Sequence, residues 1–468
     1  MGEPAAKAPL RSASEIARRV VDGKVSAGEV LEDHLARVAE ANPRLNAIVT
    51  LCEDEARRTA AAADASPKPG SLRGVPFVVK DAIAVGDVRA TAGSLLLEDF
   101  VPARDASAVR RLREAGAVFV GKTNCPEFAL DPDTDNRVFG RTLNPVNEAI
   151  IPGGSSGGDA AAVAAGLAAF GLGSDYGGSI RWPAQCTGVV GFRPTVGLVP
   201  LTGLLPFPPG EDPALPSSTT AMSRLNTLGP LARSVEDAWK VLEVVAGPDG
   251  LDPNTVPVPL GDPDAVDPKR LACAWVDGEG AHEVRSDLVD VVERAAASLG
   301  SLGLSVEKRR PPGLEDAAGT FREYRLADGL PIHAALARGN EDRLGEAMRN
   351  WFASVAVDTT VTEYQRIASR RDAIRTQVLE FMEDWPILLL PVSLLPPWPV
   401  GSADFDARFA NMAPCWAITV LGLPSLALPY GETRDGLPVS VQIVGRPFAD
   451  HEVVAVAKLL EQERLERR

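Results

Sequence analysis

Apolar and polar residues alternate along the chain with two different periodicities. Within residues 1–70 the periodicity is that of an α-helix, because the apolar positions between residues 30 and 38 fall on one helical face. Two S-x-x-E capping boxes, which mark helix starts, lie in this part of the chain: Ser12 with Glu15, and Ser26 with Glu29. We therefore expect residues 1–70 to form an N-terminal helical segment that packs on the core.

After residue 70 the pattern changes to short apolar runs, bounded by Gly or Pro, that alternate with helical segments. Helices are expected over 106–115 and 159–169. The expected strands are 75–79, 117–120, 271–276, 387–390, 425–428 and 439–444. Strands that alternate with helices predict an α/β sheet covered on both faces.

Two Pro-rich stretches, 200–216 and 248–268, predict loops or segment boundaries. Between the second stretch and the last strands, residues 313–385 form a mainly helical block with a further capping box at Thr360 and Glu363. The rest of the chain after residue 70 shows no internal repeat, so we treat 71–468 as one α/β domain.

The charge balance is acidic, with a net charge of −15, which disfavours nucleic acid and anionic membrane surfaces as partners. The five cysteines are widely separated and form no C-x-x-C pair, so neither a zinc site nor a disulfide framework is indicated. No apolar run approaches the roughly 18 residues of a membrane span, and the first residues lack the apolar segment of a secretory signal. A cytoplasmic enzyme is the expectation.

A G-x-x-x-x-G-K-[ST] match at residues 116–123 is formally a phosphate-binding loop. Such a loop follows a strand and opens a helix, whereas residues 117–120 are themselves expected to form a buried strand. Pro126 also follows closely. Nucleotide binding is therefore a minor alternative.

A G-x-S-x-G pattern occurs twice within residues 153–158, as at the nucleophile of α/β-hydrolases, which also need a later acid and a histidine. The chain has four histidines: His34 and His451 in amphipathic helical segments, His282 in a polar stretch and His333 in an apolar one. Each of these settings favours a packing or surface role. A Ser-His-Asp triad therefore has weak support.

Two Gly-flanked serine sites form a more specific set. P-G-G-S-S-G-G at 152–158 and S-D-Y-G-G-S at 174–179 are separated by an Ala-rich helix, and Lys80 ends an apolar strand. Either site alone is compatible with a tight turn, since glycine permits positive φ. Together, Ser155, Ser179 and Lys80 form a set that fits a serine nucleophile with a lysine base. From spacing alone, Lys80 is equally compatible with a strand-end lysine that reaches into solvent.

At these residues the chain resembles the amidase signature family of serine hydrolases, and the resemblance runs nearly end to end. The matching segments are 74–81, 91–94, 121–128, 151–166, 173–184, 187–195, 229–238, 246–253, 422–429 and 436–448. The resemblance implies a single large amidase-signature fold of α/β class, with a mixed central β-sheet covered by helices on both faces. Its core motif is then about 74–200, and 313–385 lies on the substrate side.

The resemblance also implies the roles of individual residues. The nucleophile corresponds to Ser179, the bridging serine, which follows a cis peptide bond in the family, to Ser155, and the base to Lys80. The oxyanion donors expected are the backbone N–H groups of the Gly-rich turn, namely those of Tyr176, Gly177, Gly178 and Ser179. The residues expected to support the site are Ser156, Asp175 and Arg181, with a helix N-cap as the equal alternative for Ser156.

Lysine can activate a serine only when it is neutral, and its reference pKa is about 10.4. Burial lowers the pKa of a lysine, and Lys80 follows an apolar run that is expected inside the sheet. Asp81 is its neighbour, but successive strand side chains point to opposite faces, so the two need not pair. The expected reaction is hydrolysis of a linear, non-peptide amide through an acyl-enzyme, with neither a metal nor an organic cofactor.

The amide itself is less well defined. The same family includes the glutaminase subunit of tRNA-dependent amidotransferases, which holds its substrate glutamine partly with an Asp. At the matching position this chain has Asn411 or Met412, and its nearest upstream Asp is Asp406. A free-standing amidase is therefore favoured over the glutaminase. Tyr176 replaces a small Thr and would narrow the acyl site or supply a hydroxyl.

A small-molecule amide is the expected partner, and a homodimer is a possible assembly. The pocket candidates, for each of which core packing is the alternative, are Phe128, Leu130, Tyr176, Phe207 and Trp416. A non-catalytic binding protein would be expected to have lost Lys80 or one of the serines, and all three are present.

Overall fold

The computed structural model of the protein describes residues 11–65, 70–206, 220–355, 359–402 and 404–467. The strands are β1 (Ile48–Leu51), β2 (Pro76–Lys80), β3 (Val118–Thr123), β4 (Phe170–Ser174), β5 (Val190–Arg193), β6 (Leu228–Ala232), β7 (Ala272–Trp275), β8 (Ser305–Lys308), β9 (Ile387–Pro391), β10 (Ser425–Glu432) and β11 (Pro438–Val444).

The helices are α1 (Ala13–Val21), α2 (Ala27–Leu45), α3 (Glu53–Ala65), α4 (Ser107–Glu114), α5 (Gly157–Ala164), α6 (Arg181–Thr187), α7 (Ala221–Leu225), α8 (Val235–Val245), α9 (Ser286–Ser301), α10 (Leu314–Asp328), α11 (Pro331–Ala337), α12 (Glu346–Ser354), α13 (Val361–Asp384), α14 (Phe405–Ala410), α15 (Ala413–Leu421) and α16 (Asp450–Glu466). Short 3₁₀ turns are η1 (Leu95–Leu97), η2 (Glu127–Ala129), η3 (Pro263–Ala265), η4 (Pro268–Arg270) and η5 (Glu341–Arg343).

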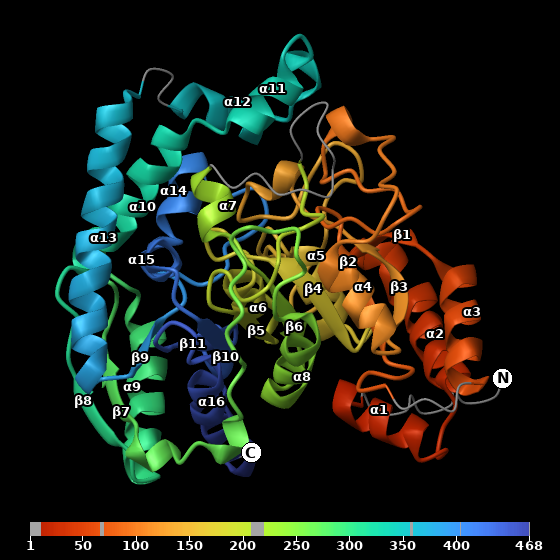
Figure 1. The fold of residues 1–468 in the computed structure, drawn as a ribbon, viewed down its shortest axis with the longest axis horizontal. Coiled ribbons are helices and arrows are strands. Elements are labelled where there is room, and N and C mark those ends of the chain that lie inside the picture. Colours follow the sequence, from red (N-terminus) through yellow and green to blue (C-terminus); the bar gives the residue numbers. More distant parts are fainter. Residues whose placement is uncertain (1–10, 66–69, 207–219, 356–358, 403, 468) are drawn as a thin grey trace.

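All these strands belong to one 11-stranded sheet with the order β1-β3-β2-β4-β6-β5-β10-β11-β9-β7-β8, which runs from right to left in Figure 1. Strand β2 is parallel to β3 and β4, and β7 is parallel to β8 and β9. The remaining pairs are antiparallel, so the sheet is mixed, as expected.

Helices cover both faces of the sheet. Every residue of β2, β3, β4, β6 and β9 is buried. Because successive strand residues point to opposite faces, a strand that is buried throughout must be covered on both sides. The expected fold class is therefore confirmed.

The six predicted strands agree with the structure within a few residues, whereas β1, β4, β5, β6 and β8 were not predicted, and β1 lies within the segment expected to be helical. One helix was predicted too long. The helix expected over 159–169 ends as α5 at Ala164. Gly166 then turns the chain with a φ of 71°, and β4 begins at Phe170. A helix interior does not accommodate positive φ, and glycine adopts it readily, so the helix stops before the next strand.

The predicted helix starts have a clear local cause. At α2, the Ser26 hydroxyl accepts from the Glu29 N–H while the Glu29 carboxylate accepts from the Ser26 N–H, which completes the capping box. Ser12 and Thr360 accept in the same way at α1 and α13. Within the described ranges, the helices are too short or too polar to cross a membrane.

Candidate active site

Lys80 lies at the end of β2 and is fully buried. Its Nζ donates to three serine hydroxyls: Ser155 Oγ at 2.7 Å, Ser174 Oγ at 3.0 Å and Ser156 Oγ at 3.1 Å. An ammonium group has three protons to donate, so a charged Lys80 is fully satisfied by these contacts. The structure therefore brings Lys80 and Ser155 together, as the sequence predicts.

Parallel pairing explains why Lys80 and Ser174 meet. Strands β2 and β4 are in register at Val79 and Leu172, so their carboxyl ends reach the same edge of the sheet. The turn that precedes α5 then carries Ser155 and Ser156 over that edge, and the Gly154–Ser155 peptide bond is cis, as the resemblance implies. In the same turn, Gly153 has a φ of 80°, and a Cβ there would lie 2.7 Å from Pro183 Cα.

Ser156 belongs to the lysine network rather than acting as a side-chain cap. It stands at the N-cap position of α5 but makes no capping hydrogen bond there. Its hydroxyl accepts from Lys80 and donates to the Ser174 carbonyl at 3.3 Å. Of the two roles considered for Ser156, the polar network is the one that the geometry supports.

Asp81 does not pair with Lys80, which agrees with the alternation along a strand. Its carboxylate accepts from the Thr91 N–H at 2.9 Å and from the Thr91 hydroxyl at 2.5 Å. Lys122, on β3, lies 3.9 Å from the other Asp81 oxygen. Lys80 is therefore free of a direct ion pair among the described residues.

Burial lowers the pKa of Lys80 to about 8, against the opposing effects of Cys125, Asp159 and Asp175. With a pKa near 8, roughly one lysine in ten is neutral at pH 7, compared with one in a few thousand at the reference value. The site thus lets a lysine act as a base near neutral pH.

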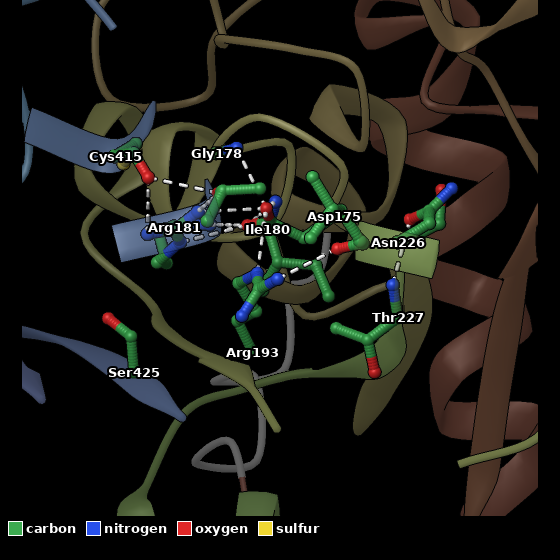
Figure 2. A network of polar contacts seen from close by, with 12 residues as sticks. Asp175, Gly178, Ile180, Arg181, Arg193, Asn226, Thr227, Cys415 and Ser425 are labelled. Atoms are coloured by element: carbon green, nitrogen blue, oxygen red, sulfur yellow. Dashed lines mark hydrogen bonds and ion pairs between the residues drawn. The ribbon is translucent and has the colours of Figure 1, made fainter. Parts of the chain in front are cut away.

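Asp175 anchors the loop that carries Ser179 (Figure 2). It is fully buried, and its two oxygens accept from the Arg181 guanidinium at 2.9 and 3.0 Å and from the backbone N–H groups of Gly178 and Ile180 at 2.7 and 3.1 Å. Arg193 lies 3.5 Å away. Burial alone would raise the pKa of Asp175, but the two guanidinium groups hold it well below its usual range.

We expect Asp175→Asn to lower the free energy of unfolding by about 3–5 kcal/mol, because it leaves two fully buried guanidinium groups without their anion. Denaturant titration of wild type and variant measures the difference. Asp277→Asn is the control: Asp277 pairs with Lys308 and Arg310 at the surface, so its loss costs at most about 1 kcal/mol. Equal shifts for the two variants would contradict this account of Asp175.

Ser179 is half-buried and follows a turn with free backbone donors. Among the described residues, the N–H groups of Tyr176, Gly177 and Ser179 have no acceptor. The Gly178 N–H differs from the expectation, because it donates to Asp175. Gly178 is still needed as glycine, since its φ is 111° and a Cβ would lie 2.5 Å from Met412 Cε.

The loops of Ser155 and Ser179 meet through the backbone, where the Ser156 N–H donates to the Ser179 carbonyl at 3.1 Å. Among the described residues, no hydrogen bond joins the hydroxyls of Ser155 and Ser179. Catalytic hydrogen bonds are often long in ligand-free enzymes and tighten when substrate binds.

A small cavity of about 30 Å³ lies at Ser179. Three of the pocket candidates, Leu130, Tyr176 and Trp416, line it. Phe128 does not; it is buried with its ring 5.1 Å from that of His333. Phe207 lies outside the described residues. The Tyr176 ring packs 5.1 Å from that of Phe321 and forms part of the cavity wall.

Leu130 and Asp131 also line a second, larger cavity of about 620 Å³ between the 126–141 segment, α12 and α14. The small cavity therefore adjoins a space that can hold a whole small molecule. Within the described part of the chain, no three His, Cys, Asp or Glu side chains are grouped to hold a metal ion.

Neither a phosphate-binding loop nor a histidine triad is formed by the described residues. The segment 117–120 is part of β3 and its neighbouring turn, and the buried Lys122 ammonium donates to the Ile83 carbonyl, so it cannot reach a phosphate. His34 is buried in α2, with its Nδ1 2.8 Å from the Val30 carbonyl. Of the residues that the structure describes, no histidine lines the cavity at Ser179.

Sequence reasoning missed several residues of this site. Ser174 was within a recognised motif, but β4, whose parallel pairing with β2 brings it to Lys80, was not among the predicted strands. Asp159 is a buried carboxyl whose own pKa burial raises, and it lies near Lys80. Arg325 lines the cavity from α10, and no local pattern marks it. Met412, one of the two positions compared with the glutaminase Asp, lines it from the start of α15.

Comparison with known proteins agrees with this geometry. A family model described as Amidase matches residues 29–454. A glutamyl-tRNA(Gln) amidotransferase subunit from Symbiobacterium thermophilum is 32% identical, with 96% of each chain covered. A solved 6-aminohexanoate cyclic dimer hydrolase is similar at 27% identity, with a TM-score of 0.84 and 97% of each chain covered. A bacterial aryl acylamidase has the same identity and TM-score, covering 97% of this chain and 96% of its own.

Fold and comparisons together define a hydrolase that acts on carbon–nitrogen bonds. The chain belongs to the amidase signature family.

Proposed function

We propose that the protein hydrolyses a linear, non-peptide amide to a carboxylate and ammonia or an amine, through an acyl-enzyme on Ser179. One observation carries the proposal: a buried lysine, Lys80, lies 2.7 Å from the Ser155 hydroxyl beside a cavity that Ser179 lines. A serine needs such a base before it can attack an amide.

Acylation then proceeds by proton transfer through Ser155. Neutral Lys80 takes the Ser155 proton, Ser155 takes the Ser179 proton, and Ser179 Oγ attacks the amide carbon. The free N–H groups of Tyr176, Gly177 and Ser179 are the candidate donors to the resulting oxyanion. The proton returns through Ser155 to the leaving nitrogen as the C–N bond breaks, and water hydrolyses the ester.

A free-standing amidase is the version of this function that we propose. Where the glutaminase subunits carry an Asp, Met412 presents an apolar side chain to the cavity, and the Asn411 side chain is held by the backbone of Leu395, whose N–H lies 2.6 Å from Asn411 Oδ1. Asp406 is exposed on α14. None of these positions offers a carboxylate to a substrate ammonium.

The second candidate is the glutaminase subunit of a tRNA-dependent amidotransferase. It is favoured by the curated relatives, which include glutamyl-tRNA(Gln) amidotransferase subunits from Clostridium acetobutylicum and Dehalococcoides mccartyi at 29% and 33% identity. Both are matched over at least 93% of their length.

A panel of amides tests the proposal by release of ammonia or amine. We expect the purified chain alone to turn over at least one primary amide or anilide with kcat/KM of about 10⁴ M⁻¹s⁻¹ or more, the lower end of the enzyme range. Matched esters serve as the positive control for acylation. Hydrolysis of L-glutamine only, and of no other amide, would support the second candidate, and no release from any amide or ester would overturn the proposal.

A further inference from the structure

Arg325 is a buried guanidinium group at the wall of the cavity that Ser179 lines. It belongs to α10, and its side chain is 5% exposed. Its Cζ lies 3.7 Å from the centroid of the Trp351 ring, 5.4 Å from that of Phe409 and 5.6 Å from that of Tyr176. Three aromatic rings from three other elements thus hold the guanidinium plane in one place.

These rings leave the N–H groups of Arg325 without acceptors. Among the described residues, Arg325 makes no hydrogen bond and no ion pair, and its buried Nε is unpartnered. A guanidinium has five N–H donors, and a buried charge is normally paired with an anion. Ring faces stabilise the positive charge but accept no in-plane hydrogen bonds.

The carboxylate that shares the cavity does not supply the missing anion. Asp131 lines the same wall, but its ion pair is with Arg408, at 3.2 Å. Burial raises the pKa of Asp131 to about 6, partly opposed by Arg408. Asp131 attracts Arg325 through space, which raises the pKa of the guanidinium against the effect of burial. Even so, none of the described residues gives Arg325 a hydrogen-bond acceptor or an ion pair, so its N–H donors stay available to a ligand.

We propose that Arg325 binds a carboxylate on the acyl chain of the substrate, so that the enzyme acts on amides that also carry an anionic group. This inference rests on the proposed function of Ser179. Arginine matches a carboxylate with two parallel hydrogen bonds, which fixes the direction of the bound chain as well as its charge. Arg325 and Ser179 line the same small cavity, so a bound carboxylate and the scissile carbonyl would be only a few bonds apart.

The position of Arg325 also explains how the charge could select substrates. Helices α10 and α12 belong to the block that the resemblance places on the substrate side, and they lie above the strands in Figure 1. A neutral acyl chain would leave the guanidinium buried without a partner, whereas an anionic chain would satisfy it. The reaction remains balanced: the amide and water give the dicarboxylate and ammonium.

The test compares substrate pairs that differ only in charge. Glutaramate and 5-methylhexanamide have chains of the same length, with an isopropyl group in place of the carboxylate; succinamate and 4-methylpentanamide form a shorter pair. We expect wild type to prefer the anionic member of at least one pair by roughly 10- to 100-fold in kcat/KM, the range for a charged hydrogen bond. Arg325→Gln should remove this preference, so that the ratio of kcat/KM between the two members of a pair falls toward one.

Two further arms separate the alternatives. Arg325→Lys should retain part of the preference, because it keeps the charge but loses the two-pronged geometry. A purely structural role of Arg325 would lower the rates on both members equally and would overturn the inference. L-glutamine, which adds an ammonium group to glutaramate, should be a poorer substrate than glutaramate; the reverse order would favour the glutaminase candidate.

A labelling experiment that needs no substrate turnover distinguishes failure of the Arg325 proposal from failure of the proposed function of Ser179. Glutarate should slow the labelling of Ser179 by a sulfonyl fluoride in wild type and not in Arg325→Gln. If Ser179 is labelled and amides are hydrolysed, but glutarate does not slow the labelling and anionic amides are not preferred, only the role of Arg325 is overturned. Absence of both labelling and hydrolysis would instead overturn the proposed function.

Discussion

Ser179→Ala is expected to lower kcat/KM for amide hydrolysis by about 10⁵-fold or more while leaving the fold intact. The variant removes the hydroxyl that lines the cavity, and the neighbouring Ser155 is held by Lys80 at 2.7 Å rather than aimed at the substrate. Losses of this order accompany removal of a serine nucleophile, because the remaining oxyanion donors and binding contacts give only residual catalysis. Steady-state kinetics on the best amide of the panel measures the change.

Intact mass spectrometry gives the same test independently of the substrate. Wild type should gain one adduct after treatment with a sulfonyl fluoride, and Ser179→Ala should gain none. Ser402→Ala, which changes an exposed serine far along the chain, is the matched control and should keep both the adduct and the activity. A Ser179→Ala protein with wild-type activity, or with an adduct at the same stoichiometry, would rule out Ser179 as the nucleophile.

The α/β class of the fold could be predicted because several strands of the central sheet are short apolar runs, although β8, with the sequence S-V-E-K, is not one of them. Strands such as β2 and β9 are buried on both faces, so their sequences show no alternation that could be mistaken for a surface strand. The strand order could not be predicted in the same way. β4 lies between β2 and β6, and β10 between β5 and β11, which depends on packing between distant segments.

Local glycine patterns located the two serine turns, since Gly153 and Gly178 both need a positive φ and close contact with another segment. The resemblance to the family then distinguished Ser155 from Ser156. The contacts of Ser156 show why residue patterns could not: both hydroxyls accept from Lys80, at 2.7 Å for Ser155 and 3.1 Å for Ser156.

Arg325 illustrates what sequence reasoning could not reach. In α10 it is one of several charged residues on a helix of mixed polarity, and nothing nearby distinguishes it from a surface residue. Its burial arises because rings from α12, α14 and the turn after β4 converge on it. A property that depends on four separate elements has no signature in any one of them.

Lys80→Met is expected to lower kcat/KM by about 10³- to 10⁴-fold and to remove the rise of kcat/KM with pH. In wild type the active form is neutral Lys80. Burial lowers its pKa to about 8, so the neutral fraction, and with it kcat/KM, should rise about tenfold per pH unit between pH 5 and 7 and level off above pH 8. Rates measured from pH 5.5 to 9.5 on a substrate that does not itself titrate define this curve.

The control for this variant is the other fully buried lysine of the sheet. Lys122 lies on β3 beside Lys80, but it contacts Asp81 and the carbonyls of the 81–83 segment instead of the serines. Lys122→Met should therefore lose stability and keep the rise in kcat/KM that levels off near pH 8. If kcat/KM of Lys80→Met rises with pH as it does in wild type, the base is a group other than Lys80. The same conclusion follows if the midpoint of the rise shifts in Lys122→Met but not in Lys80→Met. A methionine has nearly the length of lysine and no titratable proton, so a folded Lys80→Met protein isolates proton transfer from packing.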